Sequence, residues 1–566
     1  MERSFGVTKF RGLLLASSFA ALAEFLMGFL GSVISGHLLG EEALGGVSLV
    51  SPVLGFLIFL SALLGNGMGI NYSLRMGRCD RRGAAEIFTQ GIWSVLVVGG
   101  ASALALFLLR DAFFDFMEPA AAVRREAVAY WNGLIPVAVL EPLAVMLLNV
   151  CYADGDSRLC YVAYVAQLVM NVAVSLLLLR AGLGTVGCAV GVVAGYLAAA
   201  AILTGHFFRA SNSFSFVRHF SWADTWRICQ ASIGDASSYV GDAIVFFCLG
   251  KVLIVNYGSE MLPVMSAVFA ALGLVNLSGG IAVAAQPIVT VYFGERNFKA
   301  VRQVMKSVFR VMIAEAAVFT LVLTLFPSAA IALVGIRNPD VAAHAVCAVR
   351  IVSIGVVFAM FANVMNNYYQ YVERESLSLG LSVWKWLILP LFVLALFSRI
   401  GPDAVWTWYP VYNVLGVGLF FAYLRFMDGR ERFFLQLPRA RDRDISVFTL
   451  SLSPEEIVAV SQLVATKLMF AGIASQTCMR AQLMVEEVLM AVFDRNEGRR
   501  VLAEVTLDLN DGVALTIRDD GVVFDITDSD ARISSLRGYL VASVMERQAR
   551  KLNLTTTGFN RNVFRF

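Results

Sequence analysis

The segment Glu42–Gly83 reads EALGGVSLVSPVLGFLIFLSALLGNGMGINYSLRMGRCDRRG. Shifted by 217 positions, it aligns without a gap with residues 259–300, which read SEMLPVMSAVFAALGLVNLSGGIAVAAQPIVTVYFGERNFKA. Each segment starts at an acidic boundary and continues as a long apolar run rich in Gly and Ala. Each then ends at a glycine, Gly77 or Gly294, that precedes a charged turn. The two segments therefore share one plan although few residues are identical.

The same offset extends well beyond these segments. It pairs Asn149 with Asn366 and Tyr152 with Tyr369. A register that holds over more than a hundred residues indicates an internal repeat. The sequence therefore predicts a duplicated membrane bundle.

The composition requires an apolar environment for most of the chain. Of the 566 residues, 58% are hydrophobic and only 15% are charged. The charges gather between apolar runs of the length that a bilayer demands. The eight cysteines and four histidines are dispersed, without the spacing of a metal site or a disulfide framework. We find no phosphate loop or catalytic triad. The pattern favours a membrane protein that is not an enzyme, holds no metal or cofactor and binds no nucleic acid.

The apolar runs predict twelve membrane spans. The expected fold is an all-α polytopic membrane bundle of two six-helix parallel repeats, followed by a C-terminal cytosolic α/β two-layer sandwich. The spans are expected at residues 12–35, 44–73, 86–109, 127–152, 159–180, 185–208, 228–256, 261–293, 303–326, 343–371, 377–398 and 404–426.

Lys and Arg concentrate in the loops that follow even-numbered spans, which places these loops and both termini in the cytoplasm. We therefore expect a multi-pass monomer in the cytoplasmic membrane, surrounded by lipid. Six spans separate the two copies, so both enter the membrane in the same direction, as in parallel-repeat transporters. The expected domains are two lobes, a basic linker and a soluble domain, at residues 1–217, 218–430, 431–444 and 445–566.

Five acidic residues lie inside the expected spans, away from the span ends. An acid at mid-span costs about 2.5–3.5 kcal/mol on insertion scales, so each one needs a reason. Buried carboxylates can load and release a proton or hold a cation. We expect ion coupling at Glu24, Asp235 and Asp242, because the repeat places an acid in the first helix of each half at similar depth. Glu141 and Glu315 are expected to line the substrate cavity.

Uncharged polar side chains in the spans are further candidates for the substrate cavity. Hydrogen bonding between helices is the alternative for any one of them. Lys385, between two tryptophans, is an internal counter-charge candidate. The amides favoured for the cavity are Asn149, Asn171, Gln286 and Asn366, and others considered are Asn66, Gln167, Asn276 and Asn363.

The membrane part resembles the multidrug and toxic compound extrusion (MATE) antiporters over about residues 8–430. The resemblance depends on the order of several short motifs. They are Gly36-His37-Leu38-Leu39-Gly40 with Ala43-Leu44, Gly77-Arg78-Cys79-Asp80, Asn171, Gly184-Thr185-Val186-Gly187-Cys188-Ala189, and Gln286-Pro287 ahead of Gly294.

This resemblance implies two six-helix lobes around a cavity and export of organic, often cationic, compounds, driven by inward H⁺ or Na⁺. Many bacterial members carry an Asp in the first span, at the position that Gly31 occupies here. Glu24, two turns earlier on much the same face, is the candidate substitute.

The soluble tail is similar to the histidine-kinase-like ATPase fold of anti-sigma-factor serine kinases. Val485-Glu486-Glu487-Val488-Leu489 and Asp519-Asp520-Gly521-Val522-Val523-Phe524-Asp525 carry the similarity. It implies nucleotide contacts at Glu487, Asp519 and Gly521. However, Ala491 replaces the magnesium-binding Asn, and Val523 replaces a glycine that should approach phosphate. We expect a degenerate domain that regulates the bundle or recruits a cytosolic protein, with ATP binding in doubt and no kinase activity.

The sequence thus favours a cation-coupled exporter of small organic compounds. Two alternatives stay open at this point. One is a lipid-linked saccharide flippase of related architecture, although such proteins carry more Arg in the cavity. The other is a membrane-tethered sensor that signals through the C-terminal domain.

Overall fold

The structure is a computed structural model of the whole chain. Its described residues are 4–15, 17–19, 21–22, 39, 43, 47, 49–78, 80–117, 121–209, 212, 214–258, 261–273, 279–334, 339–432, 435–437, 444–510, 512–522, 550–556 and 559–566.

Two groups of helices make up the apolar part of the chain, after an N-terminal helix over residues 5–15. The first helix group is α3 (Ser51–Ser61), η1 (Ala62–Asn66), α4 (Gly67–Gly77), α5 (Arg81–Ser94), η2 (Val95–Gly99), α6 (Gly100–Met117), α7 (Ala121–Leu134), α8 (Val137–Ala153), α9 (Ser157–Arg180), α10 (Gly184–Thr204) and η3 (Gly205–Phe208). The second helix group is α11 (Trp222–Tyr257), α12 (Leu262–Gly273), α13 (Gly279–Gly294), α14 (Phe298–Leu325), α15 (Pro327–Val334), α16 (Pro339–Ser353), α17 (Val356–Tyr371), α18 (Glu375–Val383), η6 (Trp384–Ile388), α19 (Leu389–Phe397), η7 (Ala404–Thr407) and α20 (Trp408–Arg432).

The charged turn in each of the two repeated segments contains the residue that caps the next helix. Asp80 caps α5 by accepting a 2.9 Å hydrogen bond from the backbone N–H of Gly83. Asn297, at the same offset, caps α14 through the N–H of Ala300 at 3.1 Å. A short polar side chain at this position satisfies a backbone donor that has no partner within the helix. The two turns therefore end one span and start the next in the same way.

Seven helices in the described part of the chain are long and apolar enough to cross a membrane, or nine if each bent pair counts as one span. They correspond to nine of the twelve expected spans. The expected spans 12–35 and 261–293 include residues outside the described ranges, and 404–426 falls on α20, which does not pass the same criterion. The chain is therefore a multi-span membrane protein.

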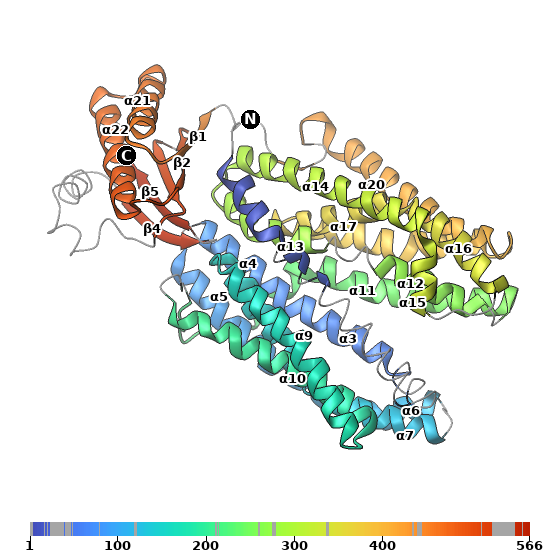
Figure 1. The fold of residues 1–566 in the computed structure, drawn as a ribbon. Coiled ribbons are helices and arrows are strands. Elements are labelled where there is room, and N and C mark those ends of the chain that lie inside the picture. The colour runs from blue at the N-terminus through green and yellow to red at the C-terminus, as the bar shows by residue number, and fades with distance from the viewer. Residues whose placement is uncertain are drawn as a thin grey trace.

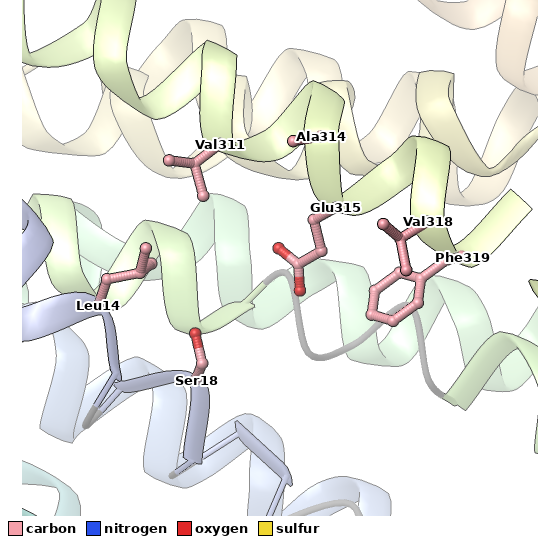
Figure 2. A pocket seen from close by; sticks show the side chains of 7 residues that line it. All are labelled: Leu14, Ser18, Val311, Ala314, Glu315, Val318 and Phe319. Carbon is pink, nitrogen blue, oxygen red and sulfur yellow. The ribbon is translucent and has the colours of Figure 1, made fainter.

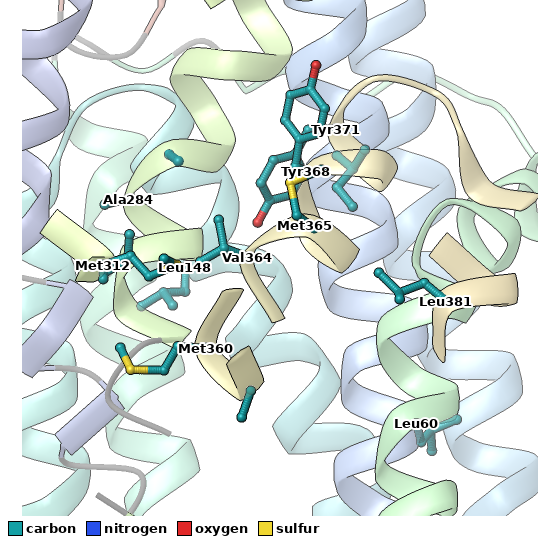
Figure 3. Packing of buried hydrophobic residues seen from close by; sticks show 14 of the residues in the cluster. Leu60, Leu148, Ala284, Met312, Met360, Val364, Met365, Tyr368, Tyr371 and Leu381 are labelled. Atoms are coloured by element: carbon teal, nitrogen blue, oxygen red, sulfur yellow. The ribbon is translucent and has the colours of Figure 1, made fainter. Parts of the chain in front are cut away.

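The two helix groups meet near the C-terminal sheet and diverge away from it (Figure 1). Their buried apolar side chains form one continuous cluster. Figure 3 shows part of it, with Leu60 of α3, Leu148 of α8, Ala284 of α13 and Met365 of α17 among the labelled side chains. The backbone of α4 in the first group comes close to two helices of the second, α11 at Gly67 and α13 at Gly77.

The C-terminal residues form a five-stranded antiparallel sheet in the order β1-β2-β3-β5-β4. Two helices pack against one face of the sheet and share with it a hydrophobic cluster separate from that of the bundle. The elements are β1 (Ile445–Ser451), α21 (Pro454–Phe470), α22 (Ser475–Arg495), β2 (Leu502–Asp508), β3 (Ala514–Asp519), β4 (Arg550–Thr556) and β5 (Phe559–Arg565).

Local signals in the sequence locate several of these elements. Ser453 caps α21 by accepting a hydrogen bond from the N–H of Glu456 at 3.3 Å, as its capping-box pattern predicts. Gly472 follows the helix with a φ of +74°, which a residue without a Cβ adopts readily. The sequence Asn510-Asp511-Gly512 predicts a hairpin turn, and the strands on either side of it, β2 and β3, pair antiparallel. The sequence also predicts a helix near 535–550, which lies outside the described residues except for its last residue, where β4 begins.

Candidate functional site

A polar network connects the two helix groups inside the bundle. The side-chain amide of Asn149 on α8 donates a hydrogen bond to the side-chain oxygen of Asn66 at 3.0 Å. The amide of Asn66 in turn donates to the carboxylate of Asp235 on α11 at 3.3 Å. Asn149 and Asp235 are both buried. The network therefore holds an acidic side chain of the second group against two amides of the first.

Local backbone features make this contact possible. Asn66 ends the π-helical turn η1, a feature often found at functional sites because it redirects side chains within a helix. At Gly67, a Cβ would lie 2.1 Å from the carbonyl oxygen of Ile228, so the backbones of α4 and α11 touch there. At Gly69, a Cβ would lie 2.6 Å from the Cβ of Asn149 and 3.2 Å from the amide nitrogen of Gln286. Gly69 thus lets Asn149 and Gln286 approach α4, which places Gln286 beside the network.

The repeat partner of Asn149 lies on the other side of α11. Asn366 on α17 accepts a 2.7 Å hydrogen bond from the hydroxyl of Ser378, which itself accepts one from Gln370. A Cβ at Gly234 would lie 2.0 Å from the Ser378 hydroxyl, so this cluster packs against α11 directly beside Asp235. The structure therefore gathers Asn149, Asn366 and Asp235 around one segment of α11.

Asp242 lies two turns further along α11 and has different surroundings. Its charge interacts with that of Lys385, which is buried in η6. The Lys385 ammonium lies 4.0 Å from the ring centre of Trp386, a distance at which the ring attracts a cation. Tyr409 and Tyr412 of α20 also interact with Asp242. Lys385 is thus a buried cation near Asp242, and its role as an internal counter-charge stays a prediction.

The remaining expected residues are more scattered. Glu141 is buried on α8, two turns before Asn149. Asn171 on α9 accepts a hydrogen bond from Ser175 and packs against the glycines of α10, which is a contact between neighbouring helices. Glu24 lies outside the described residues.

Glu315 on α14 lines a pocket of about 440 Å³ at the edge of the bundle. Its carboxylate points from α14 toward Ser18, which lies on the N-terminal segment (Figure 2). It makes no hydrogen bond or ion pair with another described residue. Apart from Ser18, the other residues that line this pocket are apolar: Leu14, Val311, Ala314, Val318 and Phe319.

The C-terminal sheet buries the carboxylate of Asp519. Asp519 at the end of β3 accepts hydrogen bonds from the side chain of Asn560 at 2.7 Å and from the N–H of Gly521 at 3.1 Å. Its other carboxylate oxygen is buried without a hydrogen-bond partner among the described residues. Burial raises the pKa of Asp519 to about 6, although these hydrogen bonds oppose the shift.

Glu487 lies on α22, whereas Gly521 packs against Asn496. The described residues hold no cluster of His, Cys, Asp and Glu that could bind a metal ion. The sequence reasoning also missed residues that complete these sites. Ser378 and Gln370 orient Asn366, and Asn560 holds Asp519. Single polar residues of this kind carry no signal in one sequence.

A family model described as MatE matches residues 16–177 and 244–394, more than half of the chain. The chain belongs to the MatE family. Every described membrane residue of the polar network falls within these ranges except Asp235, which lies between them on α11. The match ends before the C-terminal sheet.

Solved structures of MATE transporters share the fold of the bundle. One is described as the outward-facing conformation of a multidrug resistance MATE family transporter of the MOP superfamily. It is 19% identical, with 75% of this chain and 98% of that chain covered at a TM-score of 0.68. Another, MATE in the straight conformation, is 20% identical, with coverage of 74% and 96% and a TM-score of 0.69. No curated protein matched by sequence.

Membership in the MatE family makes the chain a secondary transporter of small molecules and not an enzyme. Such transporters couple movement of their substrate to an ion gradient and need no cofactor. The family and the apolar helices together establish an integral membrane protein.

Proposed function

We propose that this MatE protein is a cation-coupled antiporter that exports small organic, cationic or drug-like compounds, with H⁺ or Na⁺ as the coupling ion. The observation that carries this proposal is the network of Asn149, Asn66 and Asp235, because it places an ionisable group at the boundary between the two helix groups. Protonation or cation binding at Asp235 changes its interaction with Asn66. Such a change alters the relative stability of the arrangements of the two groups, which is what coupling requires.

Glu24, Asp235 and Asp242 are the proposed coupling acids. Glu141, Asn149, Asn171, Gln286, Glu315 and Asn366 are the proposed substrate-contacting residues. The carboxylates of Glu141 and Asp235, which are buried on α8 and α11, support a positively charged substrate, because opposite charges compensate one another in a medium of low dielectric constant. The likeness to multidrug MATE structures supports export over flipping of a lipid-linked saccharide.

The proposed architecture has twelve spans in two six-helix lobes, residues 1–217 and 218–430, related by an axis along the membrane normal. The matching N-caps Asp80 and Asn297 support this duplication. The proposed location is the cytoplasmic membrane, where the protein is a monomer. Both of its termini lie in the cytoplasm. Residues 431–444 then link the bundle to a regulatory domain, 445–566, related to histidine-kinase-like ATPases.

Reconstitution tests this function. Purified protein in vesicles loaded with a fluorescent organic cation should release it when an inward H⁺ or Na⁺ gradient is imposed. The variants Glu24→Gln and Asp242→Asn should insert normally and lose gradient-driven release. A release rate that does not depend on either gradient would refute ion coupling through these acids. An unchanged release rate in both variants would refute it as well.

A further inference from the structure

The two helix groups touch through their backbones at the end of the bundle nearest the sheet, which we call the sheet end. At Gly77, the last residue of α4, a Cβ would lie 2.6 Å from the carbonyl oxygen of Val291. At Gly294, the last residue of α13, a Cβ would lie 2.9 Å from the carbonyl oxygen of Leu74. These two glycines are 217 positions apart, so equivalent positions of the repeat meet each other here.

One side chain of the C-terminal sheet bridges this crossing. Arg561 on β5 donates hydrogen bonds of 3.1 Å to the carbonyl oxygens of Met76 and Gly77, which belong to the first helix group. Its Nε lies 2.8 Å from the carboxylate of Glu295, which follows α13 of the second group. A planar guanidinium presents donors in several directions, so it can hold both groups at once.

A second arginine completes the cluster. Arg518, opposite Arg561 on β3, also pairs with Glu295 and makes a 2.7 Å ion pair with Glu504 on β2. The hydroxyl of Tyr292 on α13 donates a hydrogen bond to Glu504, and the Arg518 guanidinium lies 4.8 Å from the Tyr292 ring centre. Arg518 and Glu504 are fully buried. Two positive and two negative charges therefore balance each other away from water.

Further contacts surround the cluster. Lys9 of the N-terminal helix pairs with Asp520, just after β3, at 3.3 Å. Arg78, just after α4, pairs with Glu373, just after α17, from one helix group to the other. The sheet end is thus closed both by direct contacts and by the C-terminal sheet placed across them (Figure 1).

We propose that the C-terminal domain is an intramolecular lock that binds the closed sheet end of the transporter through Glu295, Arg518 and Arg561 and opposes its opening. The partner of this surface of the sheet is the chain's own bundle. The proposal extends the regulatory role assigned above by naming the step that is regulated. It depends on the chain being an alternating-access transporter but not on which ion or substrate it uses.

The free-energy cost of a buried charge without a partner explains why this cluster opposes the opening of the sheet end, in addition to binding the domain to the bundle. Alternating access requires the two groups to separate at the sheet end. Separation would take the carbonyl oxygens of Met76 and Gly77 away from Glu295, so Arg561 could keep only one of its attachments. A buried ion pair that loses a partner leaves an uncompensated charge, which shifts an equilibrium on the order of a hundredfold or more. Closed and open states therefore differ in stability through this one residue.

Distances between spin labels test the lock in the full-length chain. Arg82→Cys at the start of α5 and Ser376→Cys at the start of α18 place labels on exposed positions of the two groups, in a chain whose native cysteines are replaced. The label pair should give one short distance in the otherwise unchanged protein. In Arg561→Gln, the population with a longer distance between the labels should be at least tenfold larger than in the otherwise unchanged protein. Glu295→Gln should have the same effect, since it removes the charge that both arginines share.

Two further variants on β5 test whether the effect is specific to the guanidinium of Arg561. Arg565→Gln changes an exposed arginine on the same strand and should leave the distances unchanged. Arg561→Lys keeps the charge beside Glu295 but cannot hold both carbonyl oxygens in the same geometry, so it should open the sheet end partly. It also serves as the test if Arg561→Gln fails to fold.

A second label pair, at Arg82 and Thr466 on α21, reports where the domain sits. The lock is refuted if both arginine variants leave the Arg82–Ser376 distances unchanged, or if the domain moves away while the sheet end stays closed. Neither measurement needs a substrate or an ion gradient. A failure of the proposed antiport would therefore appear in vesicles only, and a failure of the lock would appear in the label distances.

Discussion

The side-chain amide of Asn66 donates a 3.3 Å hydrogen bond to the carboxylate of Asp235, from one helix group to the other. A hydrogen bond to an ionised carboxylate contributes about 1.5–3 kcal/mol, so its loss or gain is large enough to shift a balance between two arrangements. The bond is therefore placed where the occupancy of one acid can affect the whole bundle.

Replacing either partner should impair coupling, but to different degrees. Asp235→Asn removes the ionisable group and should reduce gradient-driven export at least a hundredfold. Asn66→Ala leaves the acid but removes its donor and should reduce export roughly tenfold, the factor that about 1.4 kcal/mol represents. Ser232→Ala is the matched control, because this hydroxyl crosses the same boundary to the carbonyl of Leu63 without contacting an acid. Initial export rates in vesicles would measure all three, and equal rates in Asp235→Asn and Ser232→Ala would contradict the assignment.

The glycines at the crossing should be sensitive to a single added methyl group. Gly77→Ala and Gly294→Ala each place a Cβ within 2.9 Å of backbone atoms, closer than real contacts allow, so the crossing must open. Both variants should increase the longer-distance population of the Arg82–Ser376 label pair. Gly418→Ala on α20 meets open space and should leave it unchanged. Normal distances in both crossing variants would show that the contact is not tight.

The pH dependence of the C-terminal domain should reflect Asp519. Its pKa is about 6 in the folded state and 3.8 ordinarily, so the folded domain holds this proton more tightly than the unfolded chain. The stabilising contribution of the bound proton is therefore present at low pH and is lost as the pH rises through about 6. The difference is about 3 kcal/mol, since one pKa unit corresponds to about 1.36 kcal/mol.

Asp519→Asn should remove this dependence, because the amide oxygen can still accept from Asn560 and Gly521. Hydrogen exchange of the β3 amides in the full-length protein, corrected for intrinsic rates, should slow at pH 7.5 in this variant. Exposed Glu497→Gln is the control and should have no effect. Faster exchange in Asp519→Asn would mean that the charged carboxylate is needed in the folded domain.

The pocket of Glu315 should discriminate by charge. A carboxylate among apolar side chains favours a ligand that brings a positive charge together with an apolar body. Glu315→Gln should therefore lower the export of organic cations several-fold and leave that of neutral compounds of the same size unchanged. Equal losses for both classes would indicate a structural role for the residue.

The orientation can be tested at exposed positions. Ala181, between α9 and α10, should lie outside the cell, and Ser376 should lie in the cytoplasm. A cysteine at position 181 should react with an impermeant maleimide in intact cells, and one at position 376 only after permeabilisation. The opposite pattern would reverse the proposed topology.

The sequence predicted those parts of the fold that depend on local chemistry. The cap Ser453 acts within three residues, so its spacing from Glu456 alone places the start of α21. Gly472 likewise ends α21 through its own φ angle. The long apolar helices follow from composition because a bilayer sets their length.

The docking of the C-terminal sheet could not be predicted in this way. Glu504 and Arg518 alternate along β2 and β3 with apolar residues that face α21 and α22, and Arg561 lies between two asparagines on β5. Both patterns normally indicate a solvent-exposed face. Their burial depends on contacts with residues hundreds of positions away, such as Met76. Asp235 was found from its cost in a membrane, but its partner Asn66 could be selected from many amides only by packing.

The covalent connection between the bundle and the sheet has a consequence for how the Arg561 contact responds to its environment. A partner on the same chain is present at an effective concentration set by the linker and not by the amount of protein in the cell. Dilution, low expression or competition by a weakly binding cytosolic protein would not release the contact. Only an event that changes the affinity of the sheet for α4 and α13 would release the contact. Each transporter molecule carries its own domain, so each molecule would respond individually.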